Sequence, residues 1–142
     1  MLRYRTRDLC HLMDGQCDCG RTNIRMGRIE GRSDDMLIIR GINVFPSQVE
    51  SVVLSMPEFA PRYMLIVDRV NNLDTLQVQV EIRQEHFTGI FDTPAAVDAL
   101  EKKLANKLKS VLSIAAKVQL KAPGTIERSQ GKSAHVIDHR KL

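Results

Sequence analysis

The stretch from Leu76 to Arg83 constrains the fold of this chain more than any other part of the sequence. Apolar and polar residues alternate strictly along it: Leu76, Gln77, Val78, Gln79, Val80, Glu81, Ile82 and Arg83. Successive side chains of a strand point to opposite faces of a sheet, so the alternation predicts a strand with one buried and one solvated face. The mostly apolar run 63–68 predicts an inner strand, and Asn71-Asn72 marks a turn between the two.

Two further stretches carry helix signals. Ser47 and Glu50 have capping-box spacing, and Pro57 ends the helix that they begin. The apolar face of this first helix comprises Val49, Val52, Val53 and Met56. A second helix is expected over 94–113, with Thr93 as its cap and Pro94 in its first turn. Its apolar stripe is formed by Val97, Leu100, Leu104, Leu108 and Val111.

Short apolar strands at 36–39 and 118–121 complete the series. The predicted order from residue 36 onward is therefore β-α-β-β-α-β, an α+β domain with two helices packed on a mostly antiparallel sheet. Residues 1–35 are rich in Arg, Gly, Asp and Cys and lack sustained periodicity. We therefore expect them to form an N-terminal arm and hinge region, with the domain proper at 36–142.

Composition and charge narrow the classes of partner. The β-α-β-β-α-β order also occurs in RNA-recognition modules, but those need aromatic side chains on the open sheet face. This chain is 4% aromatic with no Trp, which argues against a nucleic-acid partner. The excess positive charge lies after residue 116, and indicates either an anionic partner or a solvated terminus. No run is long and apolar enough to span a membrane and the start lacks a signal-peptide core, so a cytoplasmic protein is expected.

The three cysteines, Cys10, Cys17 and Cys19, lie within ten residues of one another, beside His11. An odd number of cysteines does not predict a disulfide framework. Zinc binds four nitrogen or sulfur ligands in a tetrahedron. The alternatives are a complete local zinc site, half a site at Cys17 and Cys19 completed by another domain, and plain reduced thiols.

Three polar segments carry the functional information. They are the loop 4–8, the stretch from Gly31 to Glu50, and Arg128–Lys132 followed by 136–140. Together and in this order they resemble the C-terminal domain of acyl-adenylate-forming enzymes, and within that superfamily the phenylacetate-CoA ligases and related aryl-CoA ligases. The resemblance covers essentially the whole chain.

The resemblance implies that this chain is the small mobile lid of a two-domain enzyme. A large N-terminal domain, absent from this sequence, would bind ATP with Mg²⁺ and an aromatic carboxylic acid such as phenylacetate. The enzyme would form acyl-AMP and diphosphate, and coenzyme A would then displace AMP. The lid would rotate between the two half-reactions. The isolated chain is expected to be inactive.

The resemblance also assigns roles to single residues. Asp8 corresponds to an aspartate that binds the ribose hydroxyls of ATP, and Arg32 to an arginine near the nucleotide. Asp34 falls at the hinge, and Gly41 would face the channel through which CoA enters. Lys132 corresponds to the lysine that bridges the carboxylate and α-phosphate oxygens during adenylation.

The cysteine pair and the substrate leave alternatives open. Cys17 and Cys19 resemble a feature of some aryl-CoA ligases whose remaining ligands, for a shared Zn²⁺, lie in the large domain. Deazaflavin-adenylating synthetases share the same lid motifs, so a lid of that enzyme class is one alternative. A stand-alone regulatory or binding module is the other.

Overall fold

The computed structural model describes residues 4–15, 17–91, 93–126 and 135–140. The chain divides into two compact units, residues 1–36 and residues 37–142. No helix in these described segments has the length and apolarity needed to cross a membrane.

The first unit contains short strands and no buried apolar cluster among its described residues. Strands β1 (Asp8–Leu9) and β4 (Gly31–Arg32) form one antiparallel pair, and β2 (Leu12–Met13) and β3 (Arg25–Met26) form another. The buried core residues of the described chain all lie between Ile39 and Leu120. Backbone hydrogen bonds, rather than a hydrophobic core, therefore define the local structure of this unit.

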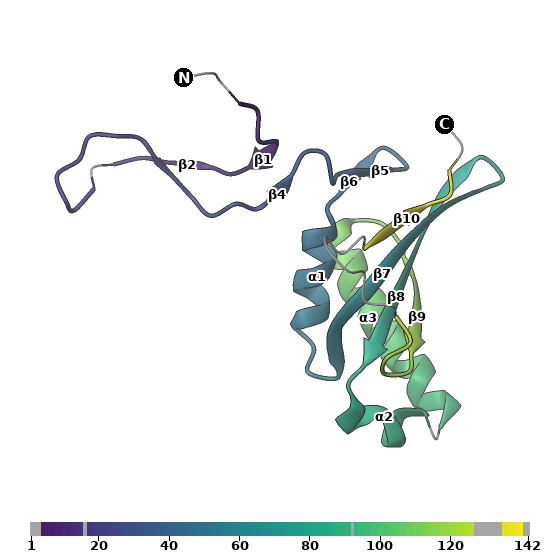
Figure 1. The fold of residues 1–142 in the computed structure, drawn as a ribbon. Coiled ribbons are helices and arrows are strands. Elements are labelled where there is room, and N and C mark those ends of the chain that lie inside the picture. The colour runs from purple at the N-terminus through teal and green to yellow at the C-terminus, as the bar shows by residue number, and fades with distance from the viewer. Residues whose placement is uncertain (1–3, 16, 92, 127–134, 141–142) are drawn as a thin grey trace. The chain divides into compact units, whose positions relative to one another are not determined.

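The second unit is built on a four-stranded sheet with the order β10-β7-β8-β9 (Figure 1). Its strands are β7 (Phe59–Val70), β8 (Leu73–Ile82), β9 (Lys117–Lys121) and β10 (Val136–Asp138). The two long central strands pair antiparallel around the Asn71-Asn72 turn, whose residues have φ values of 50° and 61°. This type of two-residue turn matches the twist of the strands that it joins. The predicted central hairpin is thus confirmed.

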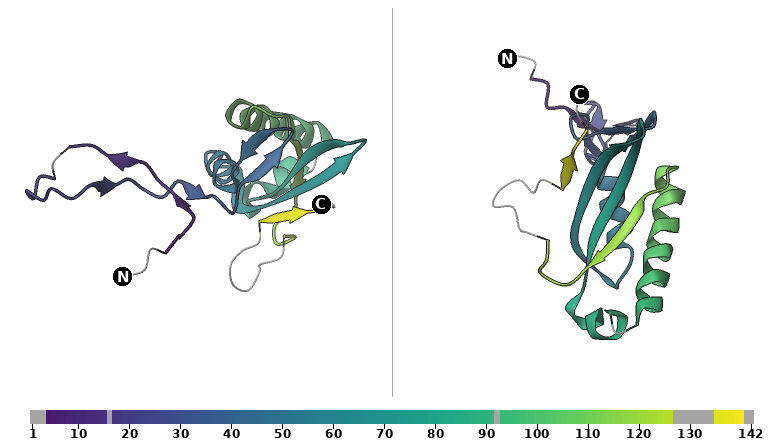
Figure 2. Two further views of the ribbon diagram at one scale, coloured as in Figure 1. Left: turned by 90° about the horizontal axis from the view of Figure 1, so that it is seen from above. Right: turned by 90° about the vertical axis from the view of Figure 1, so that its right-hand side faces the viewer.

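Two helices cover one face of this sheet (Figure 2). Helix α1 (Pro46–Leu54) packs against β7 and against α3 (Pro94–Leu112), which also contacts β9. The inward residues of α3 are Leu100, Leu104, Leu108 and Leu112. The core between helices and sheet also contains Phe59, Tyr63 and Leu65 from β7. The predicted α+β class is therefore confirmed.

The structure differs from the predicted order in four elements. The predicted strand 36–39 exists as β5 (Leu37–Ile39), but among the described strands it pairs with β6 (Ile42–Val44) alone, in a separate hairpin. Strand β6, helix α2 (Gln84–Phe91) and strand β10 were not predicted. Both outer strands of the sheet pair in parallel with their neighbours, so the expectation of a mostly antiparallel sheet holds only for its centre.

Three expectations about side chains are also wrong. The first helix begins two residues earlier than predicted, with Phe45 at the N-cap, and Gln48 Oε1 accepts a hydrogen bond from the Phe45 N–H at 3.1 Å. The Ser47 and Glu50 capping box is therefore wrong. In α3, Leu112 is buried and Val111 is exposed, because the inward stripe keeps a spacing of four. Glu81, expected on a solvated face, is only 2% exposed.

Candidate functional site

Asp8 and Arg32, which are far apart in the sequence, lie opposite each other on β1 and β4. The pairing is extended by a hydrogen bond from the Ser33 N–H to the Arg7 carbonyl oxygen at 2.7 Å. The ladder places a carboxylate and a guanidinium on neighbouring strands. A carboxylate can accept two hydroxyl groups, and a guanidinium has a planar set of donors for phosphate or ribose oxygens.

Asp34 binds Arg32 at the end of this ladder. Arg32 Nε and Nη2 donate to the two carboxylate oxygens at 3.0 and 2.9 Å, and Arg7 Nη1 lies 3.6 Å from Oδ2. The hydrogen bonds from Arg32 lower the pKa of Asp34, and the same contact raises the pKa of Arg32. Three predicted site residues, Asp8, Arg32 and Asp34, are therefore brought together in the first unit. Asp34 also lies two residues before the boundary between the units.

Gly41 lies in the second unit, at the tip of the β5–β6 hairpin. Arg40 and Gly41 have φ values of 51° and 78°, and Ile39 pairs with Ile42 across them. These values describe a two-residue turn that requires positive φ at both positions. Apart from Gly41 and its two chain neighbours, no described residue has an atom within 4 Å of the position that a Cβ of residue 41 would occupy. The backbone at this tip is therefore open to a close approach.

Asp74, near the start of β8, accepts hydrogen bonds from three arginines beside this hairpin. Its carboxylate accepts hydrogen bonds from Arg69 at 2.8 Å and Arg140 at 3.0 Å, and its carbonyl oxygen accepts one from Arg40 at 2.7 Å. Arg140 also donates to both carboxylate oxygens of Asp138. Arg69 is the main cause of a lowered pKa at Asp74, and Arg140 of a lowered pKa at Asp138.

We expect this cluster to make the stability of the chain sensitive to acid. Both carboxyl pKa values are depressed in the folded state below the ordinary value of 3.8. Their contribution to the free energy of unfolding is therefore present above that value, and it is lost as the pH falls through the folded pKa values. Urea unfolding between about pH 5 and about pH 2 should show this loss. Arg140→Ala should make the free energy of unfolding less dependent on pH over this range. The same pH dependence in the variant as in the wild type would contradict the assignment.

Lys132 lies outside the described residues, but the structure describes both flanks of its segment. On one side, the Ile126 N–H donates to Glu81 Oε1 at 2.6 Å. On the other, the His135 ring stacks on Tyr63 with centroids 4.5 Å apart, and its carbonyl oxygen accepts a hydrogen bond from the Leu65 N–H at 2.7 Å. The chain is therefore attached to the sheet immediately before and after residues 127–134.

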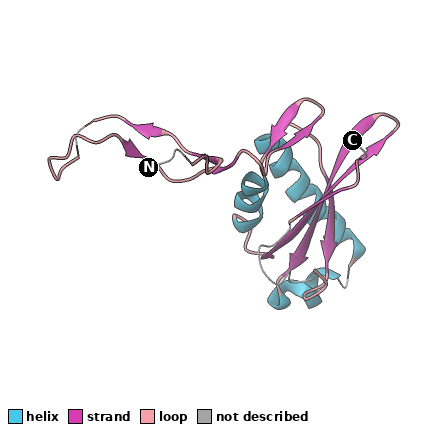
Figure 3. Ribbon diagram, turned by 45° about the horizontal axis from the view of Figure 1, so that its top comes forward, coloured by secondary structure: helices cyan, strands magenta, loops and turns pink. Residues whose placement is uncertain are grey.

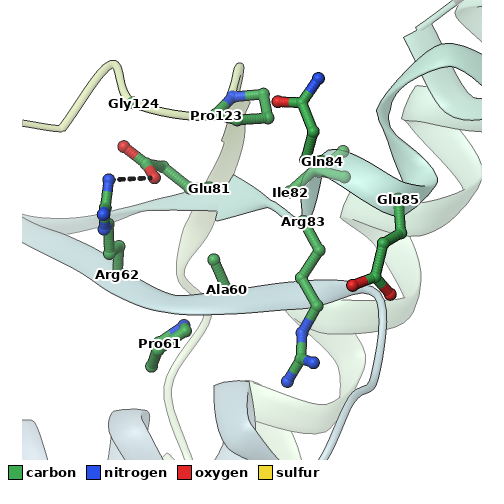
Figure 4. A pocket seen from close by; sticks show the side chains of 10 residues that line it. All are labelled: Ala60, Pro61, Arg62, Glu81, Ile82, Arg83, Gln84, Glu85, Pro123 and Gly124. Atoms are coloured by element: carbon green, nitrogen blue, oxygen red, sulfur yellow. Dashed lines mark hydrogen bonds and ion pairs between the residues drawn. The ribbon is translucent and has the colours of Figure 1, made fainter.

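Glu81 is the functional candidate that sequence reasoning missed. Arg62 Nη1 lies 3.3 Å from Glu81 Oε2, and both side chains line an open pocket of about 600 Å³ beside Pro123 and Gly124 (Figure 4). A signal did exist, since continuing the regular count outward from the Asn71-Asn72 turn would place Arg62 opposite Glu81, although the observed register becomes irregular between Phe59 and Tyr63. That cross-strand pairing predicts an ion pair, although it does not predict its burial.

Cys17 and Cys19 lie close together in the first unit. A hydrogen bond joins the two sulfurs at 2.9 Å, and it lowers the pKa of the Cys19 thiol. His11 binds Glu30 instead of joining the pair. In the described part of the chain, no group of three or more His, Cys, Asp or Glu side chains could hold a metal ion. A zinc site takes four nitrogen or sulfur ligands, and the described residues do not bring that many together.

Comparison with protein families and with similar proteins indicates which family this chain resembles. Residues 41–140 match the family of AMP-binding enzyme C-terminal domains. The chain is 42% identical to the phenylacetate-coenzyme A ligase of Thermus thermophilus, over 99% of this chain and 34% of that protein. It is 45% identical to the phenylacetate-coenzyme A ligase of Aromatoleum evansii, over 99% of this chain and 31% of that protein. The chain thus spans about a third of the length of these relatives.

Solved structures of CoA ligases also match this chain. A 2-hydroxyisobutyryl-CoA ligase in its postadenylation state matches with a TM-score of 0.79 and 31% identity, over 95% of this chain and 28% of that one. The same ligase with its acyl adenylate and CoA in the thioesterification state matches with a TM-score of 0.66 and 31% identity, over 94% and 27%. A domain of a phenylacetate-coenzyme A ligase from Bacteroides vulgatus matches with a TM-score of 0.67 and 29% identity, over 76% and 95%.

Proposed function

Because this chain belongs to the family of AMP-binding enzyme C-terminal domains, we propose that it is the mobile lid of an AMP-forming acid-CoA ligase. The carrying observation is the likeness to phenylacetate-coenzyme A ligases along 99% of the chain. The proposed substrates are phenylacetate or a similar aromatic acid, ATP with Mg²⁺, and coenzyme A, all used in the cytoplasm. The acid pocket and most of the ATP site would belong to a large domain that precedes residues 1–35, the proposed arm and hinge, and 36–142, the proposed lid.

In the first half-reaction, a carboxylate oxygen of the acid bonds to the α-phosphorus of ATP, and the bond to diphosphate breaks. Lys132 would bridge the carboxylate and α-phosphate oxygens, where its ammonium group offsets the developing negative charge. Asp8 would accept hydrogen bonds from the ribose hydroxyls, and Arg32 would bind nucleotide oxygens. The juxtaposition of Asp8 and Arg32 on β1 and β4 supports this pairing of roles.

In the second half-reaction, the sulfur of CoA bonds to the acyl carbon, AMP leaves, and the thiol proton is released to water. The lid would rotate about Asp34 so that Gly41 faces the arriving thiol. The open position at residue 41 supports this role, since a bare backbone permits close approach. Cys17 and Cys19 would be half of a zinc site shared with the large domain, and no step of the reaction passes through that metal.

The test compares the full-length enzyme with the isolated 142-residue chain. We expect the full-length enzyme to form phenylacetyl-CoA and release diphosphate when given phenylacetate, ATP and CoA. The isolated chain should form neither product, because it lacks the acid pocket. Acetate and a deazaflavin are tested as alternative substrates in control reactions. Thioester formation by the isolated chain, or none from aromatic acids by the full-length enzyme, would contradict the proposal.

A further inference from the structure

The β5–β6 hairpin needs support from outside its own two strands. In the described chain, β5 and β6 hydrogen-bond only to each other as a sheet. An isolated two-stranded hairpin is only marginally stable in water. Ile39 and Val44 are buried and fix the inner side of the hairpin, whereas Ile38 is 53% exposed on the other. The geometry of the tip must therefore depend on contacts made along its outer edge.

Arg140 makes such a contact. Residues next to a two-residue turn exchange both hydrogen bonds, and the next pair along does not, so the polar backbone groups of Ile38 point away from β6. The Ile38 carbonyl oxygen accepts a hydrogen bond from Arg140 Nη1 at 2.6 Å. This bond joins the edge of the hairpin to the segment that follows β10, about a hundred residues later in the chain.

The guanidinium of Arg140 is itself held rigidly. Nη1 also donates to Asp74 Oδ2 at 3.0 Å, while Nε and Nη2 bind the Asp138 carboxylate at 2.9 and 2.6 Å. The Arg140 and Asp74 side chains are only 14% and 13% exposed. Bidentate charge-assisted bonds away from water are stronger and better defined in direction than exposed ion pairs. A planar group bound on several sides offers a fixed donor to the hairpin.

The tip of the hairpin also bonds directly to Asp74, the residue that binds Arg140. Arg40, the first turn residue, donates from Nε to the Asp74 carbonyl oxygen at 2.7 Å. Asp74 stands beside the β7–β8 turn, and the tips of the two hairpins project from the same end of the unit (Figure 3). The Arg40-Gly41 turn is thus fixed to the sheet through its own side chain and through its outer edge.

We propose that Arg140 is a positioning residue for thioester formation, holding the Arg40-Gly41 turn where it must meet coenzyme A. The inference rests on the proposed function, in which Gly41 lines the path of the thiol. Arg140 itself does not touch a substrate. A displacement of about 1 Å at a reacting centre can lower a rate about 100-fold, so loss of this support should appear in acyl transfer. Adenylation uses Lys132 instead of this turn, so it should be spared.

The experiment uses three variants of the full-length enzyme. Arg140→Ala removes every contact of the guanidinium, and Arg140→Lys keeps the charge but not the planar set of donors. Arg69→Ala is the matched control, because the side-chain hydrogen bond and ion pair of Arg69 within the described chain go to Asp74 Oδ1 and not to the hairpin. ATP–diphosphate exchange measures adenylation. Thioester formation from supplied phenylacetyl-AMP, followed as a function of CoA concentration, measures transfer.

We expect Arg140→Ala to slow transfer by about 10- to 100-fold with exchange within about twofold of the wild type. Arg140→Lys should show a smaller loss in the same step, and Arg69→Ala should change neither. Equal losses of both steps in the two Arg140 variants would overturn the inference, and so would normal transfer in Arg140→Ala. If the wild-type enzyme is active in either case, the proposed function still stands. A wild-type enzyme that forms no acyl-CoA would overturn both.

Discussion

Replacing Lys132 with alanine in the full-length enzyme is expected to lower ATP–diphosphate exchange by about 100- to 1000-fold. In the proposed mechanism its ammonium group offsets negative charge that develops only as the acid attacks the α-phosphorus. Removing a preorganised charge of this kind acts on the transition state of that step alone. Thioester formation from supplied phenylacetyl-AMP should therefore continue within about twofold of the wild-type rate.

Lys117→Ala provides the matched control, since Lys117 is an exposed lysine at the start of β9 in the same basic part of the chain. It should leave both half-reactions unchanged. If Lys132→Ala lost both steps equally, the lysine would have no role specific to adenylation. If it lost neither, the likeness to acyl-adenylate-forming enzymes would extend to the fold and not to this residue.

The second large effect is expected at Glu81. Its carboxylate, 2% exposed, accepts hydrogen bonds from the Ile126 N–H and from Arg62. Glu81→Ala would leave the partly buried Ile126 amide and Arg62 guanidinium without their acceptor. Loss of a shared acceptor of this kind costs about 2 kcal/mol in free energy of unfolding. Urea unfolding of the 142-residue chain should show a lower transition midpoint at an unchanged slope.

Two further variants sharpen that measurement. Glu81→Gln keeps an oxygen acceptor for Ile126, so it should destabilise the chain less than alanine does. Glu85→Ala removes an exposed carboxylate from the wall of the same pocket and should cost less than about 1 kcal/mol. If Glu81→Ala and Glu85→Ala lowered the free energy of unfolding equally, the buried contacts of Glu81 would contribute nothing specific to stability.

The parts of the fold that the sequence predicted well carry periodic signals of useful length. The alternation around Val78 and the stripe around Leu104 each repeat several times, so a single exception does not hide them. Strands β6 and β10, which were not predicted, have only three residues each, which is too short for a period to be recognised. The parallel pairing of the outer strands depends on long connections, and it leaves no local pattern.

The candidate site shows the same division. Asp8 and Arg32 meet through a ladder of two residues on each strand, so family resemblance could identify them while periodicity could not. Glu81 was placed on a solvated face because strand alternation distinguishes two faces but does not reveal what covers each one. The covering segment around Ile126 comes from a distant part of the chain. Its effect on burial appears only in three dimensions.

The turn at Gly41 has a stereochemical consequence. The empty space around its missing Cβ means that glycine is required there by the sign of φ and not by crowding. An L-alanine at this position would meet the left-handed penalty of roughly 1 kcal/mol or more. A D-alanine, whose preferred φ is positive, would place a methyl group in the same open space without that penalty. The tip of the hairpin therefore selects for handedness and leaves room for size.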